Sequence, residues 1–259
     1  MGIWAHAVVN LLVALGMLAI IPLGLRLIGQ VPWWWFAGAV PGAISLFLPR
    51  GQAAAALALV YFVVTLLVAT RAVHERRIAI ITALVSPVVA SVSLVAERAE
   101  YQLMGFELDV LVLTVAHFHY AGFAAALIAG LVSRMTDRPL ATVAAWTVPL
   151  GTGIVFAGYF SNDFVELAGA AVLTAGMWLT GWLTWRYVRP KAKRQGLLNV
   201  SAGVLVLTMV LALIWALGEA IGTPHLSWDA MVMTHGVANA LGFALCAMLA
   251  WQGLAKEGQ

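Results

Sequence analysis

Residues 197–221 read LLNVSAGVLVLTMVLALIWALGEAI, a run in which Glu219 is the only charged side chain. At about 1.5 Å rise per residue, a helix of about 20 apolar residues crosses the ~30 Å hydrocarbon core of a bilayer. A helix on the surface of a soluble protein would carry a polar face along this length. The stretch therefore predicts a transmembrane helix.

Comparable apolar runs, separated by charged or turn residues, fill the rest of the chain. The predicted spans are 4–28, 33–48, 53–69, 78–96, 110–132, 140–160, 164–188, 197–221 and 230–254. The second span is short and contains Pro41, so it is either a crossing or a re-entrant, kinked segment, and the latter leaves eight spans. The sequence thus predicts an all-α fold, a polytopic transmembrane helix bundle forming one domain over residues 1–259.

Composition supports the bilayer as the main solvent. Of the 259 residues, 63% are hydrophobic and 10% are charged, whereas soluble domains carry about 25% charged residues. The spans leave no room for a soluble catalytic domain, so any chemistry must lie within or between helices. The single cysteine, Cys246, excludes an intramolecular disulfide and a CxxC motif. No basic region precedes the first apolar run, which we therefore expect to be retained as a helix.

The distribution of Lys and Arg predicts the topology, because these residues concentrate in cytoplasmic loops. If all nine spans cross, two of the fourteen Lys and Arg residues, Arg50 and Arg98, lie on one side. The other side holds the remaining twelve: Arg26, Arg71, Arg76, Arg77, Arg134, Arg138, Arg186, Arg189, Lys191, Lys193, Arg194 and Lys256. This split predicts a multi-pass protein of the cell (inner) membrane with its N-terminus outside and its C-terminus in the cytoplasm. If the second span does not cross, Arg26 moves to the outer side and both termini lie inside. The tryptophans at 33–35 predict an interfacial aromatic belt.

The acids follow the opposite pattern. Eight of the eleven lie at or near the outer side: Glu97, Glu100, Glu107, Asp109, Asp163, Glu166, Glu219 and Asp229. His117, His119 and His235 are expected about 10 Å into their spans. Asn239 lies one helical turn beyond His235. Ionisable groups inside a membrane are costly and are candidates for function.

Structural roles compete with functional ones at each of these positions. His235 and Asn239 are also suited to interhelical hydrogen bonding, and Glu97 to pairing with Arg98. Asp163 and Glu166 begin a predicted span, where the helix dipole favours negative charge. On an ideal helix His117 and His119 point about 200° apart, so that His117 shares a face with Tyr120 and His119 with Phe123.

Two strings, HFHYAGF at 117–123 and THGVANALGF at 234–243, resemble the YndJ-like family of bacterial membrane proteins. His117, His119, Tyr120, His235 and Asn239 occupy the motif positions. Some family-like proteins of actinobacterial pathways are assigned as membrane terpenoid cyclases, which act on a prenylated substrate with a terminal epoxide. The resemblance therefore implies a membrane-bound terpene cyclase.

Such a reaction needs a carboxylic acid that stays neutral near pH 7, since the epoxide must be protonated. We expect the donor among Glu97, Asp163, Glu166 and Glu219, and expect His117, His119 or His235 to bond that acid or return the proton. The residues expected to contact the substrate, several of them aromatic and suited to carbocations, are Tyr120, Phe123, Tyr159, Asn162, Trp215 and Asn239. We expect a lipophilic isoprenoid and membrane lipid as partners, no nucleic acid, and neither a metal nor another cofactor.

Two other classes of function stay open. Three histidines and several carboxylates at one depth could bind zinc, iron or haem, although the chain has no HxxxH or HExxH motif. A non-enzymatic transporter, sensor or scaffold would also carry polar groups inside the membrane. In each case we expect close helix packing at small residues: Gly122, Gly130, Gly153, Gly169, Gly176 and Gly181.

Overall fold

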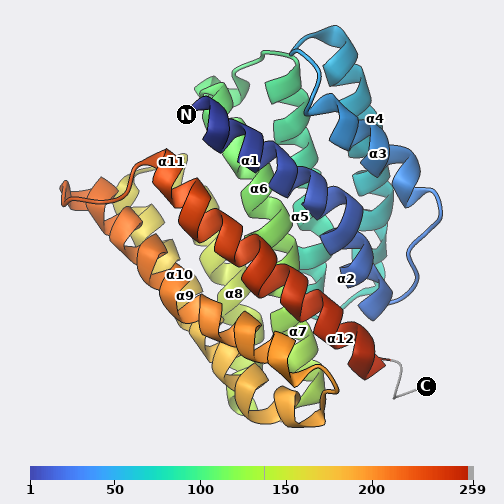
Figure 1. Ribbon diagram of the computed structural model, residues 1–259, viewed down its shortest axis with the longest axis vertical. Helices are drawn as coiled ribbons and strands as arrows, with labels where there is room; N and C mark the ends of the chain where they lie inside the picture. Colours follow the sequence, from blue (N-terminus) through green and yellow to red (C-terminus); the bar gives the residue numbers. More distant parts are fainter. Residues whose placement is uncertain (137, 256–259) are drawn as a thin grey trace. The chain divides into compact units, whose positions relative to one another are not determined.

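The computed structural model describes residues 1–136 and 138–255. Within these residues every regular element is a helix (Figure 1), as expected for a polytopic transmembrane helix bundle. Lys256, counted above on the basic side, lies outside the described residues.

Eight helical segments are long and apolar enough to cross a membrane. They are Ile3–Leu27, Gln52–His74, Ile78–Arg98, Leu108–Met135, Pro139–Gly158, Asp163–Lys191, Gln195–Ile221 and Trp228–Leu254. These match eight of the nine predicted spans to within a few residues at most ends, which confirms the fold class. The remaining predicted span, the second one at 33–48, forms only the eleven-residue helix α3 (Trp35–Ser45), with Pro41 inside it.

The described chain packs as two compact units. Unit 1 comprises Met1–Arg76 with Ile80–Ala124, and unit 2 comprises Arg77–Ala79 with the described residues from Ala125 onward. The division falls inside the helical segment Leu108–Met135. That the whole chain acts as a single domain stays a prediction.

Unit 1 contains five passes of the chain. The first is α1 (Ile3–Leu15), the π-helical turn η1 (Gly16–Ile20) and α2 (Ile21–Leu27). The second pass is the segment with α3. The third is α4 (Gln52–Ala69) with η2 (Thr70–His74), and the fourth is α5 (Ile78–Arg98). After the short turn η3 (Leu103–Gly105), the fifth pass is α6 (Leu108–His117), continued by the π-helical stretch η4 (Phe118–Ala125).

Hydrogen bonds between loops decide the course of the second pass. At one end of unit 1, the Arg98 guanidinium donates to the Ser45 carbonyl at the end of α3, and Gly51 N donates to the Arg98 carbonyl. At the other end, Arg71 donates to the Gln30 carbonyl just before α3. The segment therefore returns the chain from one end of the unit to the other instead of re-entering, although only part of it is helical.

The predicted aromatic belt at 33–35 stays a prediction for Trp33, whose side chain is free to face a membrane interface, and is wrong for Trp35. Trp33 is 85% exposed, whereas Trp35 is fully buried and donates its indole N–H to the Met17 carbonyl at 3.0 Å. That carbonyl lies in the π-helical turn η1, where the regular helical bonding pattern is interrupted. The indole thus ties α3 to the first pass.

Unit 2 contains α7 (Ala126–Met135), α8 (Pro139–Gly158) and α9 (Asp163–Leu183), which continues through η5 (Thr184–Val188) and η6 (Arg189–Lys191). Next come α10 (Gln195–Ile221) and α11 (Trp228–Met231). The last pass continues through η7 (Val232–Gly236), η8 (Ala238–Leu245) and α12 (Cys246–Ala255).

Glycines allow α8 and α9 to approach closely, as predicted for Gly169 and Gly176. A Cβ atom at Gly176 would lie 2.7 Å from Thr147 Oγ1 on α8. Gly158, at the end of α8, has the same role, since a Cβ there would lie 2.7 Å from the backbone of Glu166. The prediction was wrong for Gly153, because a Cβ there would meet no atom within 4 Å.

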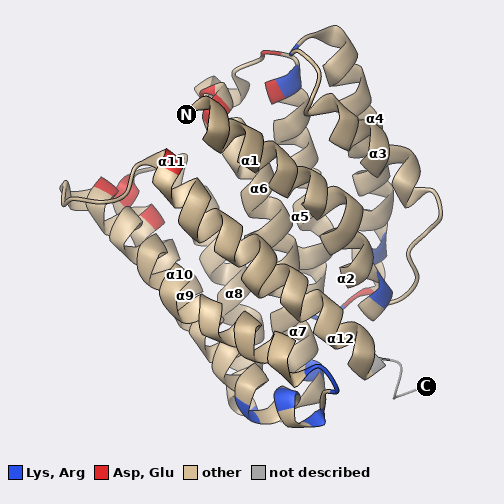
Figure 2. Ribbon diagram, in the orientation of Figure 1, with Lys and Arg blue, Asp and Glu red and all other residues tan. Residues whose placement is uncertain are grey.

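Charge is segregated within unit 2 (Figure 2). The acids Asp163, Glu166, Glu219 and Asp229 lie at the end where α9 begins and α10 finishes. The described Lys and Arg residues of its loops lie at the other end, around the start of α8 and the connection from α9 to α10. We call these the acidic end and the basic end of unit 2.

Candidate functional site

The predicted site residues divide between the two units. Unit 1 holds Glu97, His117, His119, Tyr120 and Phe123. Unit 2 holds the rest: Tyr159, Asn162, Asp163, Glu166, Trp215, Glu219, His235 and Asn239. Within each unit the side chains form separate clusters, each with its own partners.

In unit 1, His119 pairs with a residue that the sequence reasoning missed. Its Nε2 lies 2.8 Å from the hydroxyl of Tyr61 on α4, and both side chains are fully buried. The Nδ1 atom of His119 is buried without a hydrogen-bond partner among the described residues. A signal for Tyr61 was present in the sequence, since a tyrosine hydroxyl inside an apolar span needs a polar partner.

The lack of a side chain at Gly16 lets the first pass lie close against this pair. A Cβ at Gly16 would lie 2.8 Å from His119 Nδ1, so only glycine fits there without a shift of the histidine. The neighbouring Trp35 ring meets Tyr61 edge-on, with the ring centroids 5.8 Å apart. His119 is thus enclosed by aromatic and backbone atoms.

Of the two neighbouring histidines, His119 faces the interior and His117 does not. His117 is exposed, and its Nδ1 lies 3.1 Å from the Leu113 carbonyl of the same helix. Phe123 is fully buried, as expected for the face that bears His119. The expectation that Tyr120 shares the exposed face of His117 was wrong. Tyr120 is buried and donates to the Leu12 carbonyl at 2.7 Å, because the π-helical stretch from Phe118 changes the angular spacing of side chains.

Glu97 forms a buried ion-pair cluster at one end of unit 1. Its carboxylate accepts hydrogen bonds from Arg98 and, at 2.8 Å, from Arg50, and the Glu97 side chain is fully buried. Arg98 also donates to the carbonyls of Ser45 and Leu46 at the end of α3. The cluster joins the ends of three helical passes. A carboxylate bound by two guanidinium groups has the geometry of an ion-pair partner rather than of a free acid.

His235 and Asn239 form an interhelical network in unit 2, as the structural alternative predicted. Asn239 Nδ2 lies 3.2 Å from His235 Nε2, and Asn239 accepts from the Thr208 hydroxyl of α10 at 2.9 Å. His235 Nδ1 lies 2.8 Å from the Thr208 carbonyl. One threonine on α10 thereby contacts both motif residues of the last pass.

The remaining predicted residues gather at the acidic end of unit 2. Asn162 caps α9, since its side-chain oxygen accepts from the backbone N–H groups of Phe164 and Val165. This capping places Asp163 and Glu166 in the first turn of α9, where the helix dipole favours them. Asp163 and Glu219 lie close enough to interact electrostatically with the half-buried carboxyl of Glu166.

His225 adds a second group that the sequence reasoning missed. It lies in the loop after α10, and its Nε2 is 3.1 Å from a carboxylate oxygen of Glu219. Its ring meets Trp215 edge-on at 4.7 Å between centroids. Gly222, in the left-handed conformation (φ 73°), ends α10, and the chain then turns back so that His225 packs over Gly218. The sequence did contain a signal for this contact, because Gly222 and Pro224 indicate a turn within the few residues that separate Glu219 from His225.

Aromatic side chains border the acidic end. Phe156 meets Phe160 edge-on at 5.2 Å and Tyr159 at 6.4 Å between ring centroids. Tyr159 lies just beyond α8, where burial of its hydroxyl, and secondarily the negative charge of Glu166, raise its pKa above the ordinary value. Its phenol therefore keeps its proton over the physiological range and can donate a hydrogen bond.

The acidic end thus combines the interacting carboxyl groups of Asp163, Glu166 and Glu219 with a protonated phenol, an imidazole and an aromatic border. The described Lys and Arg residues of unit 2 lie at its other end (Figure 2), so they do not neutralise these carboxyls. Carboxyl groups crowded without a cation can share protons, and such a set is suited to acid–base chemistry. In residues 1–136 and 138–255, no three His, Cys, Asp or Glu side chains are grouped as ligands for a metal ion.

Comparison with known proteins agrees with this membrane architecture. The family model described as YndJ-like protein matches residues 11–243. The chain belongs to the YndJ-like family. It is 25% identical over 159 residues to the uncharacterized membrane protein YndJ of Bacillus subtilis (strain 168). That alignment covers 61% of this chain and 29% of the relative, so the chain spans less than a third of the relative's length. No solved structure matches this member of the family.

Proposed function

We propose that this YndJ-like membrane protein is a proton-transfer catalyst, a terpene cyclase that opens the terminal epoxide of a prenylated, lipid-like substrate at the acidic end of unit 2. The observation that carries the proposal is the grouping of Glu166, Asp163 and Glu219 at one end of a transmembrane helical unit, without a neighbouring Lys or Arg of that unit. Resemblance of the family motifs to those of membrane terpenoid cyclases supports the choice of substrate.

Glu166 is the proposed proton donor. It is half-buried at the start of α9, beside two further acids, and its position is fixed by the close contact of its backbone with Gly158. Glu97, the other buried candidate, is bound by Arg50 and Arg98 and is less suited to the role. Of the four acids expected as proton donors, Glu166 is therefore the one that we propose.

The reaction follows from these groups. Glu166 gives its proton to the epoxide oxygen, a carbon–oxygen bond breaks, and the π electrons of a neighbouring alkene form the new ring bond. The resulting carbocation is stabilised by the faces of aromatic side chains such as Trp215. Glu219, whose carboxylate His225 holds at 3.1 Å, accepts the proton that leaves. The product is a cyclic alcohol with the mass of the substrate.

Access for an apolar substrate is available from the bilayer. Phe160 and Phe164, on either side of the turn between α8 and α9, are 51% and 63% exposed. Exposed aromatic side chains at the end of a membrane helix are suited to the boundary between hydrocarbon and headgroups. A lipid-dissolved isoprenoid would therefore reach Glu166 without passing through water.

The test is product analysis of membranes containing the full chain, supplied with farnesylated or geranylgeranylated terminal epoxides. We expect a cyclic alcohol of unchanged mass, formed equally with and without a chelator. Glu166→Gln should lower turnover by about 10²-fold or more, the usual contribution of a general acid. Glu107→Gln, an acid in the unit 1 loop before α6, is the matched control and should retain activity.

Two outcomes would contradict the proposal. Equal turnover in Glu166→Gln and the unmodified protein would remove Glu166 as donor. Absence of product from both epoxides, with the protein folded and in the membrane, would reject the cyclase function.

A further inference from the structure

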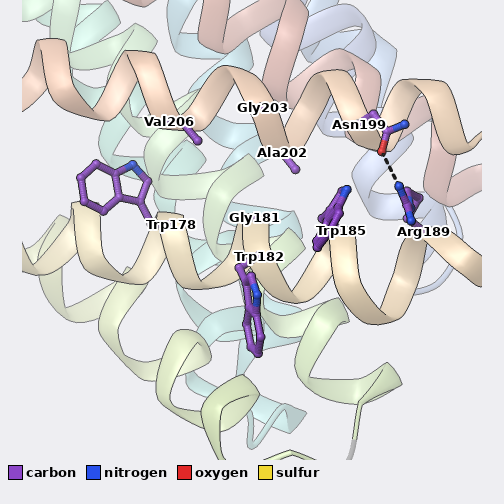
Figure 3. A pocket seen from close by; sticks show the side chains of 9 residues that line it. All are labelled: Trp178, Gly181, Trp182, Trp185, Arg189, Asn199, Ala202, Gly203 and Val206. Atoms are coloured by element: carbon purple, nitrogen blue, oxygen red, sulfur yellow. Dashed lines mark hydrogen bonds between the residues drawn. The ribbon is translucent and has the colours of Figure 1, made fainter.

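A groove lies on unit 2 between α9 with its continuation η5 and α10, toward the basic end and away from the residues discussed above (Figure 3). Its volume is about 450 Å³. Its lining is Trp178, Gly181, Trp182, Trp185, Arg189, Asn199, Ala202, Gly203 and Val206. The polar groups of this lining are the side chains of Arg189 and Asn199 and the indole N–H groups. The rest of the lining is apolar, and it contains no carboxylate.

The groove is built for an elongated apolar group. Trp178, Trp182, Trp185 and Arg189 follow one another at intervals of three or four residues along α9, η5 and η6, and all four line the groove. From Trp178 to Arg189 the helix rises roughly 16 Å, about half of the ~30 Å hydrocarbon core. The groove therefore has the length of one leaflet.

Hydrogen bonds hold both ends of the groove. Trp178 donates its indole N–H to the Leu205 carbonyl of α10 at 3.2 Å. At the basic end, Arg189 donates to the Asn199 side chain at 3.4 Å, and its guanidinium lies 5.1 Å from the centroid of the Trp185 ring. The floor consists of small residues, and a Cβ atom at Gly203 would meet nothing within 4 Å.

The charge at the basic end identifies the kind of ligand. Arg189 supplies the positive charge of the groove lining, and the lining holds no carboxylate to pair with it. Residues 186–194 add Arg186, Lys191, Lys193 and Arg194, with no acid among them. Both α9 and α10 are transmembrane helices, and the three indoles that line the groove are 41–45% exposed. The molecule available to cover them in a bilayer is a lipid.

We propose that this groove is a binding site for an anionic glycerophospholipid of the surrounding bilayer. One acyl chain lies along the three indoles toward Trp178, and the phosphate accepts hydrogen bonds from Arg189. Basic pockets between transmembrane helices are suited to anionic headgroups, and zwitterionic lipids lack the net charge that such a pocket attracts. The proposal is independent of the reaction proposed at the acidic end.

The experiment measures lipid retained by the purified full chain, using native mass spectrometry from micelles with equal phosphatidylglycerol and phosphatidylcholine. We expect a preference of about fivefold for phosphatidylglycerol, from one Arg near the phosphate. Arg189→Gln should abolish this preference. The matched control Arg186→Gln, a basic residue of the same segment that does not line the groove, should keep it.

A second pair of variants tests the apolar part. Gly203→Leu places a side chain in the groove at a position where the space for its Cβ is open. Displacing two methylene groups of the lipid corresponds to about tenfold less retention of either phospholipid. Gly196→Leu, also on α10 and also in open space, does not line the groove and should retain lipid normally. Identical losses in Arg189→Gln and Arg186→Gln, or unchanged retention in Gly203→Leu, would overturn the site.

Discussion

Removal of the Glu97 carboxylate should destabilise unit 1 more than the loss of any exposed acid. Glu97 is fully buried and Arg98 is 2% exposed, so Glu97→Gln leaves one guanidinium charge in the interior without its counter-ion. Breaking a buried ion pair from one side costs about 3–5 kcal/mol.

Details of the cluster place the effect at the lower end of that range. Arg98 keeps its contacts to the carbonyls of Ser45, Leu46 and Leu48, at 3.2–3.5 Å. The other partner, Arg50, is 30% exposed and can be hydrated instead. We therefore expect Glu97→Gln to lower the free energy of unfolding by about 3 kcal/mol.

Equilibrium unfolding of the purified protein by a denaturing detergent, followed by tryptophan fluorescence, measures this quantity. Glu107→Gln serves as the exposed control and should change stability by less than about 0.5 kcal/mol. A cycle with Arg98→Met adds a second criterion. Glu97→Gln strands the Arg98 charge, and Arg98→Met leaves Glu97 paired with Arg50 alone. The double variant Glu97→Gln with Arg98→Met should therefore cost less than the two single effects combined, by about 1–3 kcal/mol. Additive effects, or equal stability of Glu97→Gln and Glu107→Gln, would refute this account of the cluster.

Three further predictions concern other parts of the molecule. Tyr61→Phe leaves His119 Nε2 buried without its partner and should cost about 1–3 kcal/mol of unfolding free energy, measured by the same titration; unchanged stability would contradict this role of the pair. Gly158→Ala places a Cβ against the backbone of α9 and should cost about 1–3 kcal/mol, whereas Gly153→Ala should be neutral or stabilising; similar effects of the two would show that the helix contact yields easily. In a Cys246→Ser background, an impermeant maleimide added to intact cells should label Glu107→Cys and not Lys193→Cys, since loops rich in Lys and Arg stay cytoplasmic; the reverse labelling would invert the proposed topology.

The amino-acid sequence was sufficient to predict the bundle because the bilayer imposes a simple constraint. A span must be apolar over about 20 residues and must satisfy its own backbone hydrogen bonds, and both requirements are local. Eight spans, the start of α9 near Asp163 and Glu166, and close helix packing at Gly176 could therefore be predicted. The course of the segment around α3 could not, because it depends on Arg98 and Arg71 binding loop carbonyls distant in sequence.

For the candidate site, the sequence by itself determined which polar groups lie in or near the membrane and toward which end of their helices. Only the tertiary structure decided their partners: Glu97 with two arginines, His119 with Tyr61, His235 with Thr208 and Asn239, and Glu219 with His225. The π-helical stretch from Phe118 turned Tyr120 to the interior, and no regular helical period predicts such a shift. Trp35 is buried because its indole donates to the Met17 carbonyl in the π-helical turn η1. Depth in the membrane follows from hydropathy along the chain, whereas the choice of partner depends on packing between helices, and that packing determines which polar groups remain for chemistry.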